Sequence, residues 1–223
     1  MLLDTKERKW ERINSGLMDT LSPSVYNGII GGMILYGFLL NALIVVFCGN
    51  VFASINPEVL YIGYFICCVI GIFITRSDSP ITSFIGYNLV VVPISSILSV
   101  SLPYYNPQDI LSAIAVTSAT VAIMTTISTS APHFFEKMGP TLFITLLVAI
   151  ITELAATFIG YGGGIFNWIF VIIFTLYIGY DWHKAQLYPK TLDNAIDTSL
   201  EIYLDVINLF VRLLTIFDRD DDD

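Results

Sequence analysis

Charge is scarce in this chain. Of its 223 residues, 13% are charged and 55% are hydrophobic, and the mean hydropathy is +0.75. A soluble domain of this size carries more charge than that. The composition therefore excludes a soluble globular domain and predicts a polytopic membrane protein. The formal charge of −9 discourages nucleic-acid binding, and much of it lies in the terminal segment 218–223.

Residue patterns that identify a chemistry are also missing. The three cysteines, Cys48, Cys67 and Cys68, lack the spacing of a zinc site, so we expect them to pack within the spans. The chain has no Ser/His pair, H-E-x-x-H motif or phosphate loop, and we expect no enzymatic activity and no cofactor. We see no cleaved signal peptide. The sparse loops and the absence of Asn-x-Ser/Thr sites favour a prokaryotic plasma membrane.

Apolar runs separated by turn residues predict an all-α fold with about seven spans. We expect a cytoplasmic segment over residues 1–22, a single seven-span domain over 23–217 and an acidic tail over 218–223. The N-terminal segment reads as a short helix on the membrane surface. We expect the first span over about Ser24–Cys48, the second after the turn at residues 56–58 up to Ile74, the third over about Ile81–Leu102 and the fourth after Pro107 up to about Ser130. The fifth span follows Gly139, the sixth ends near Trp182 and the last covers Ala195–Phe217.

Glycine and proline mark special positions in these spans. Gly28 and Gly32 have the G-x-x-x-G spacing that permits close helix packing, and Pro93 predicts a kink in the third span. In the fourth span, small residues favour close packing over a polar conduit. Residues 160–164 are glycine-rich and separate the fifth span from the sixth.

Basic residues predict the orientation. With the N-terminus inside, the inner side receives Lys6, Arg8, Lys9, Arg12, Arg76, Lys137, Lys184 and Lys190. The outer loops contain no Lys or Arg, so the positive-inside rule is satisfied and the acidic tail lies outside.

The last span carries a polar stripe on an apolar helix. Its members recur at helical spacing and are Asp197, Glu201, Asp205, Asn208 and Arg212. Carboxylates at bilayer depth cost several kcal/mol unless they face a bundle interior, a cavity or a partner. We therefore expect the C-terminal helix to lie at the centre of the bundle.

Two aspartates of the last two spans are predicted to meet. At ~1.5 Å per residue, Asp205 lies about 12 Å from the inner end of its helix, and Asp181 lies within about two turns of the inner end of the sixth span. Arg76 ends the second span on the same side. For Asp181 and Arg76 taken singly, a solvated position is an equal alternative. Two adjacent carboxylates would titrate as a coupled pair, and their oxygens would bind calcium transiently.

Other titratable residues have simpler interpretations. Glu153 and Arg212 fall at similar depth in the outer half, where a structural ion pair is favoured over a role in an ion path. His133 and His183 lie in inner-side loops without metal-ligand spacing, so we expect both to be solvated.

The end of the chain resembles a known family. Tyr180-Asp181, followed by the segment from Ala195 to Phe210 (AIDTSLEIYLDVINLF), is similar to the C-terminal signature of the Bax inhibitor-1 family. The resemblance is strongest over the last fifty or so residues. It implies a seven-helix fold with a central last helix, and a calcium leak that responds to pH through two aspartates. By position these are Asp181 and Asp205, with Arg76 as the family's arginine.

Two departures from the family limit what the resemblance carries over. The chain has no acid within the second span, and it ends in aspartates where animal members have a basic tail. We therefore carry over no cell-death partner, and the expected partners are the lipid bilayer and calcium ions.

The functional prediction is a pH-sensitive calcium leak with a gate of Asp181, Asp205 and Arg76 and a path along Asp197, Glu201 and Asn208. One alternative is a non-conducting membrane scaffold of the Bax inhibitor type, because buried polar residues also serve packing. An aspartyl intramembrane protease is disfavoured, since Ile202-Tyr-Leu-Asp205 lacks the Gly-x-Gly-Asp motif of those enzymes.

Overall fold

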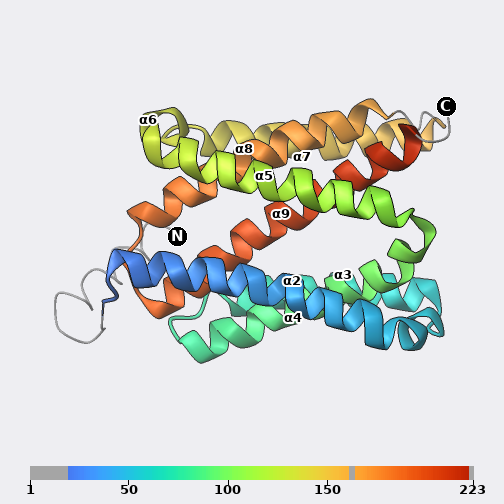
Figure 1. The fold of residues 1–223 in the computed structure, drawn as a ribbon, viewed down its shortest axis with the longest axis horizontal. Helices are drawn as coiled ribbons and strands as arrows, with labels where there is room; N and C mark the ends of the chain where they lie inside the picture. Colours follow the sequence, from blue (N-terminus) through green and yellow to red (C-terminus); the bar gives the residue numbers. More distant parts are fainter. Residues whose placement is uncertain (1–19, 161–163, 221–223) are drawn as a thin grey trace. The chain divides into compact units, whose positions relative to one another are not determined.

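A computed structural model describes residues 20–160 and 164–220. The described residues are mainly helical and contain no strand. Figure 1 shows the helices, which are α2 (Pro23–Ala53), α3 (Pro57–Ile74), α4 (Pro80–Ser101), the 3-10 turn η1 (Leu102–Tyr104), α5 (Pro107–Ser130), α6 (Pro132–Phe135), α7 (Gly139–Phe158), α8 (Ile165–Leu187) and α9 (Leu192–Asp220). The predicted surface helix before residue 20, the centre of the glycine-rich segment and the last three aspartates lie outside the described residues.

Proline and its neighbours determine where the helices begin. Helices α2 to α7 all have proline at the first or second position, where its missing amide costs nothing. The Ser22 hydroxyl accepts a hydrogen bond from the amide of Val25, and the Asn56 side chain accepts one from Glu58. The start expected near Ser24 is therefore confirmed to within one residue, whereas α3 begins at Pro57, within the segment expected to form a turn.

Several helices extend beyond the apolar runs that predicted them. Helix α2 continues to Ala53 rather than Cys48, α8 to Leu187 rather than Trp182, and α9 from Leu192 to Asp220. An apolar run marks only the part of a helix that matches the hydrocarbon core, and the helical backbone continues into the polar headgroup region. Helix α4 includes Pro93 in its interior.

The chain forms two compact units. The first holds the described residues up to Tyr104 together with Leu187–Glu201, and the second holds the described residues of Tyr105–Gln186 and those from Ile202 onward. Helix α9 contributes to both units, because Glu201 and Ile202 are consecutive residues within it.

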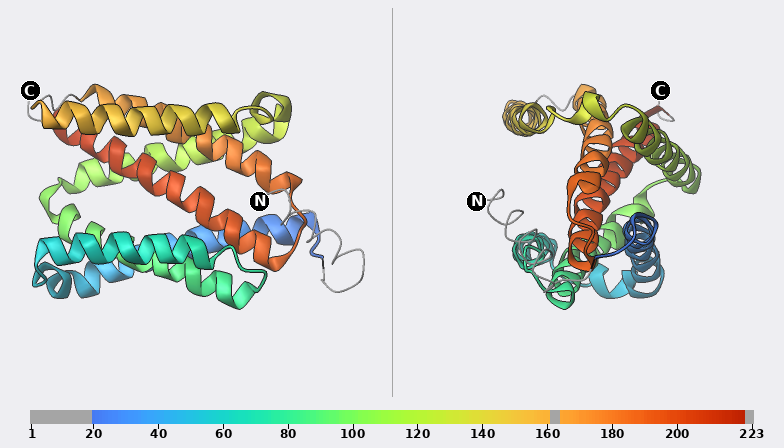
Figure 2. Two further views of the ribbon diagram at one scale, coloured as in Figure 1. Left: turned by 180° about the vertical axis from the view of Figure 1, so that it is seen from behind. Right: turned by 90° about the vertical axis from the view of Figure 1, so that its left-hand side faces the viewer.

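Helix α4 forms the core of the first unit. It packs against both α2 and α3, and Figure 2 shows these three helices side by side. Tyr87 is fully buried and donates a hydrogen bond of 2.7 Å to the carbonyl of Met33. Ser95 of α4 donates one of 2.6 Å to Asn41 of α2. Polar groups of the spans thus bond to neighbouring helices.

Close backbone packing occurs at Gly71 and Gly86 rather than at the predicted G-x-x-x-G pair. A Cβ at Gly71 would lie 2.8 Å from the Gly86 carbonyl oxygen, and one at Gly86 would lie 2.7 Å from the Gly71 carbonyl oxygen. By contrast, no described atom lies within 4 Å of a Cβ built at Gly28 or Gly32. The packing role expected for Gly28 and Gly32 is therefore wrong, because a spacing within one helix does not specify which face a neighbour covers.

The C-terminal parts of α5 and α8 are joined in the second unit. Ser128 of α5 donates a hydrogen bond of 2.7 Å to the carbonyl of Gly179, and the Trp182 indole donates one of 3.1 Å to Thr129. Ser128 is buried, so this small residue of the fourth span serves helix packing, as expected.

Six described helices are long and apolar enough to cross a membrane: α2, α3, α4 with η1, α5, α7 and α8. Helix α9 is also long, with 29 residues, but it includes Glu201, Asp205 and Arg212. Its apolar side chains are buried along much of its length, including Leu200, Leu209 and Leu214, as predicted for the central helix. The protein is an all-α, multi-pass membrane protein.

Candidate functional site

Asp181 lies in α8 and is 7% exposed. The Lys184 ammonium lies 3.6 Å from its Oδ1 atom, one helical turn further along. The side chain of Lys184 is 24% exposed and that of Asp181 is 9% exposed, so the aspartate end of this ion pair is shielded from solvent. The cation nearest to Asp181 in sequence was not anticipated, although the spacing of three residues is one that brings side chains together on a helix.

Asp205 lies in α9 and is 8% exposed. The side chain of Tyr177 interacts electrostatically with both Asp205 and Asp181. Both aspartates are therefore near enough to Tyr177 of α8, in the second unit, for their charges to act on it, and their direct pairing stays a prediction. Tyr177 was not singled out from the sequence, although it precedes Asp181 by four residues and shares its helix face.

The segment that carries Asp181 is held tightly by its neighbours. Gly179 packs against the ring of Phe135 and the end of Met124, and a Cβ there would clash with both. The ring of Tyr180 packs directly against Gly139. Contacts on both residues before Asp181 leave little room for this turn of α8 to shift.

Arg76 belongs to the first unit, immediately after α3. Its side chain is exposed, and the guanidinium lies over the ring of Phe73 at 5.4 Å from the centroid. The aspartates Asp181 and Asp205 belong to the second unit. The pairing of Arg76 with Asp181 therefore stays a prediction.

The residues of the polar stripe on α9 have different environments. Asp197 and Glu201 are half-buried and interact electrostatically with Tyr26. Asn208 is exposed, and its amide donates a hydrogen bond of 2.7 Å to the carbonyl of Leu204 in the previous turn. Their role in an ion path stays a prediction.

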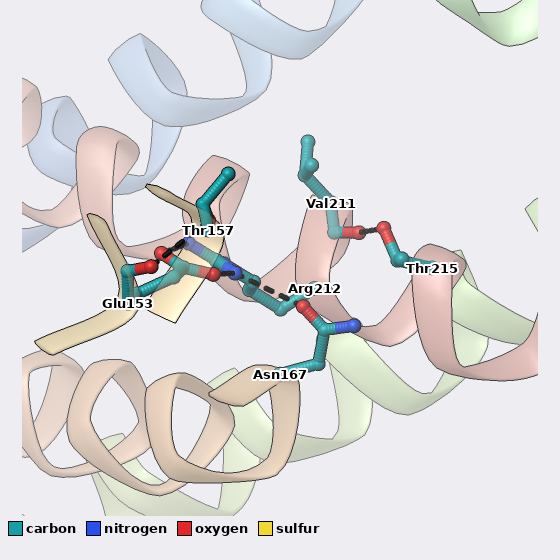
Figure 3. Close-up of polar contacts among 6 residues, drawn as sticks. All are labelled: Glu153, Thr157, Asn167, Val211, Arg212 and Thr215. Atoms are coloured by element: carbon teal, nitrogen blue, oxygen red, sulfur yellow. Dashed lines mark hydrogen bonds and ion pairs between the residues drawn. The ribbon is translucent and has the colours of Figure 1, made fainter. Parts of the chain in front are cut away.

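The structure brings Glu153 and Arg212 together (Figure 3). The Arg212 guanidinium donates two hydrogen bonds to the Glu153 carboxylate, of 2.5 and 2.9 Å, and a third of 3.0 Å to Asn167. It also lies over the ring of Phe170 at 4.0 Å from the centroid. Bidentate arginine–carboxylate pairs fix the relative orientation of the two side chains and also neutralise their charges. The cluster joins α7, α8 and α9.

The two histidines differ in their exposure to solvent. The side chain of His133 is 95% exposed and lies 3.5 Å from Glu136. His183 is only 8% exposed, and within the described residues its Nε2 atom has no hydrogen-bond partner. The expectation that His183 is solvated is wrong, because α8 continues to Leu187 and keeps this residue within the helix.

Two further buried carboxylates were not singled out from the sequence. Asp193 in the first turn of α9 is fully buried, and Asp109 in the first turn of α5 is 6% exposed. Both positions are typical of acids, because the positive end of the helix dipole favours negative charge there. Among the described residues, no group of three or more His, Cys, Asp or Glu could hold a metal ion.

Lysine 190 lies in the loop between α8 and α9. Its ammonium lies over the ring of Tyr26 at 4.6 Å, and its carbonyl accepts a hydrogen bond from the amide of Leu21. Burial lowers the pKa of Lys190 from its ordinary value. This loop therefore anchors the residues that precede α2.

The fold and the site define a class: multi-pass helical membrane proteins with carboxylates buried in their last two long helices. The chain belongs to the family Bax1-I, Inhibitor of apoptosis-promoting Bax1, whose model matches residues 19–222. The resemblance seen in the C-terminal segment thus extends over nearly the whole chain.

The chain is similar to proteins of a virus, a fungus and a bacterium. The Golgi anti-apoptotic protein of vaccinia virus is 23% identical over 175 residues, which is 77% of this chain and 73% of that protein. Bax inhibitor 1 of Schizosaccharomyces pombe is 26% identical over 168 residues, 73% of this chain and 62% of its own length. A Helicobacter pylori protein is 29% identical over 116 residues. The match covers 48% of this chain and about half, 49%, of that relative.

Proposed function

We propose that this protein is a calcium leak of its membrane and that Asp181 and Asp205 make the leak sensitive to pH. The observation that carries the proposal is the burial of both aspartates in α8 and α9, the last two long helices, with Tyr177 near enough to both for their charges to act on it. An ionisable residue within a span is by default a candidate for an ion pathway or a proton relay.

Gating follows from the charge of the two aspartates. At high pH both are ionised, and Arg76 ties the end of α3 to α8 through Asp181, which closes the inner mouth. As pH falls, the pair takes up a shared proton, so less charge is available to Arg76 and the mouth opens more often. A latch that loses ~1.4 kcal/mol shifts its equilibrium about tenfold.

The proposed path runs along α9. Asp197, Glu201 and Asn208 supply oxygen atoms, which are the ligands that calcium prefers. Calcium binds transiently at Asp181 and Asp205 on its way, and no cofactor takes part. Glu153 and Arg212 stay outside the path and hold the outer half of the second unit together.

Reconstitution into liposomes of pure lipid tests the proposal. Wild-type protein should pass calcium faster at about pH 6 than at about pH 8, and Arg76→Ala should flatten this difference by keeping the leak open at high pH. Lys137→Ala, which changes an exposed loop cation, is the matched control. Calcium flux no higher than in protein-free liposomes would contradict a leak.

The second candidate function is a non-conducting membrane scaffold. It is favoured by the name of the vaccinia virus relative, an anti-apoptotic protein, and by the Glu153–Arg212 cluster, which shows that polar residues of this chain join helices. A scaffold would fold normally in the same liposomes and pass no calcium at any pH.

We also propose a prokaryotic plasma membrane as the location, with the N-terminus in the cytoplasm and the C-terminus on the opposite side. The basic residues on the inner side support this orientation. The proposed partners are the bilayer and calcium ions, and we expect no enzymatic activity.

A further inference from the structure

A single buried hydroxyl joins three parts of the first unit. Ser83 of α4 is fully buried. Its Oγ atom lies 2.7 Å from Oδ1 of Asp193, 3.0 Å from the carbonyl oxygen of Thr75 and 3.4 Å from that of Ser77. A hydroxyl has one proton, so the three acceptors share one donor.

Two of these acceptors belong to the residues on either side of Arg76. Thr75 is 5% exposed, whereas Arg76 is exposed. The Thr75 backbone also packs closely against Gly86, because a Cβ at Gly86 would lie 2.7 Å from the Thr75 amide nitrogen. The turn that presents Arg76 is therefore fixed at its buried side.

The third acceptor belongs to the helix that carries Asp205. Asp193 is fully buried in the first turn of α9, and α9 is continuous to Asp220. The hydroxyl of Ser83 thus links the turn of Arg76 directly to the beginning of α9. Nothing in the path or gate proposed above assigns a role to either Ser83 or Asp193.

We propose that Ser83 and Asp193 are positioning residues that hold the turn of residues 75–77 against the start of α9 and so set the reach of Arg76. The part that concerns Arg76 as a latch rests on the proposed function. The tie itself does not, since it is defined by hydrogen bonds within the first unit.

Hydrogen–deuterium exchange in detergent tests the tie without reference to ion flux. In Ser83→Ala the amides of residues 75–79 should exchange roughly two- to tenfold faster, the range expected for one lost hydrogen bond. Ser95→Ala is the matched control, because Ser95 is also a fully buried serine of α4 that bonds to another helix. It should leave residues 75–79 unchanged.

Variants of Asp193 separate hydrogen bonding from charge. Asp193→Asn keeps an acceptor for Ser83 and should retain slow exchange, whereas Asp193→Ala should match Ser83→Ala. Unchanged exchange at residues 75–79 in both alanine variants would overturn the proposal.

Calcium flux in liposomes then tests the link to Arg76. Ser83→Ala should weaken the pH response in the same direction as Arg76→Ala, while Ser95→Ala should keep the wild-type profile. Faster exchange together with a pH profile that none of these variants changes would leave the tie standing and contradict the arginine latch.

Discussion

The charge of Lys184 acts directly on Asp181. Its ammonium lies 3.6 Å from the carboxylate and favours the ionised form. We expect Lys184→Gln to move the rise in calcium flux to higher pH, because Asp181 then takes up a proton more readily. Flux profiles of this variant and of Lys137→Gln, a control in an exposed position, check the prediction. A shift to lower pH would contradict it.

Glu153 should matter for stability rather than for the pH response. Breaking a buried ion pair typically costs about 3 to 5 kcal/mol. Here the side chains of Arg212 and Glu153 are 25% and 30% exposed, so we expect Glu153→Gln to cost an amount near the low end of that range. Thermal unfolding in detergent measures the change.

The matched control is Glu136→Gln. Its partner His133 is 95% exposed and Glu136 itself is 57% exposed, so the same substitution should leave stability nearly unchanged. A Glu153→Gln protein with normal stability but an altered flux profile would place Glu153 in the ion path instead.

At the scale of helices, the crossing of α3 and α4 depends on glycine. A Cβ at Gly71 would meet Val90 at 2.7 Å and the Gly86 carbonyl at 2.8 Å, so Gly71→Ala should cost about 1 to 3 kcal/mol. Gly63→Ala on the same helix meets no described atom within 4 Å and should gain up to about 1 kcal/mol from helix propensity. Thermal unfolding of the two variants gives the comparison. Equal stabilities would contradict the close crossing.

The starts of the helices could be predicted from the sequence, because proline and a preceding cap are local signals. Ser22 and Pro23, at the start of α2, are the example. Helix contacts were predicted less well. Gly28 and Gly32 had the familiar spacing, but Gly71 and Gly86 make the contact, and they lie on different helices. No pattern within one helix reveals such a pair.

For the candidate site too, some features could be predicted from the sequence and others could not. Burial of Asp181 and Asp205 follows from their place in apolar spans, and the depth of Glu153 and Arg212 suggested their pairing. The contacts of Asn167 and Phe170 with Arg212 were not predicted, because neutral and aromatic residues are common in spans. Asp193 precedes Ala195, the predicted start of the last span, and only the fold brings Ser83 to it.

At the scale of the whole molecule, we expect α9 to cross the bilayer as the seventh span. Its 29 residues are long enough, although its acids set it apart from the six apolar helices. We expect alkaline phosphatase, which is active only outside the cytoplasm, to be active when fused after α9 and inactive when fused in the loop at Lys190 in a bacterial host. Inactivity of both fusions would place α9 on the inner side.

Calcium flux in liposomes as a function of pH tests the central claim most directly. Between about pH 5.5 and pH 8.5, wild-type flux should rise as the coupled aspartates take up a proton. Asp181→Asn should flatten the response, because Arg76 loses its partner. Asp205→Asn should move the response to lower pH or abolish it, because Asp181 loses the neighbour with which it shares a proton. A wild-type pH profile retained by both asparagine variants would contradict the account.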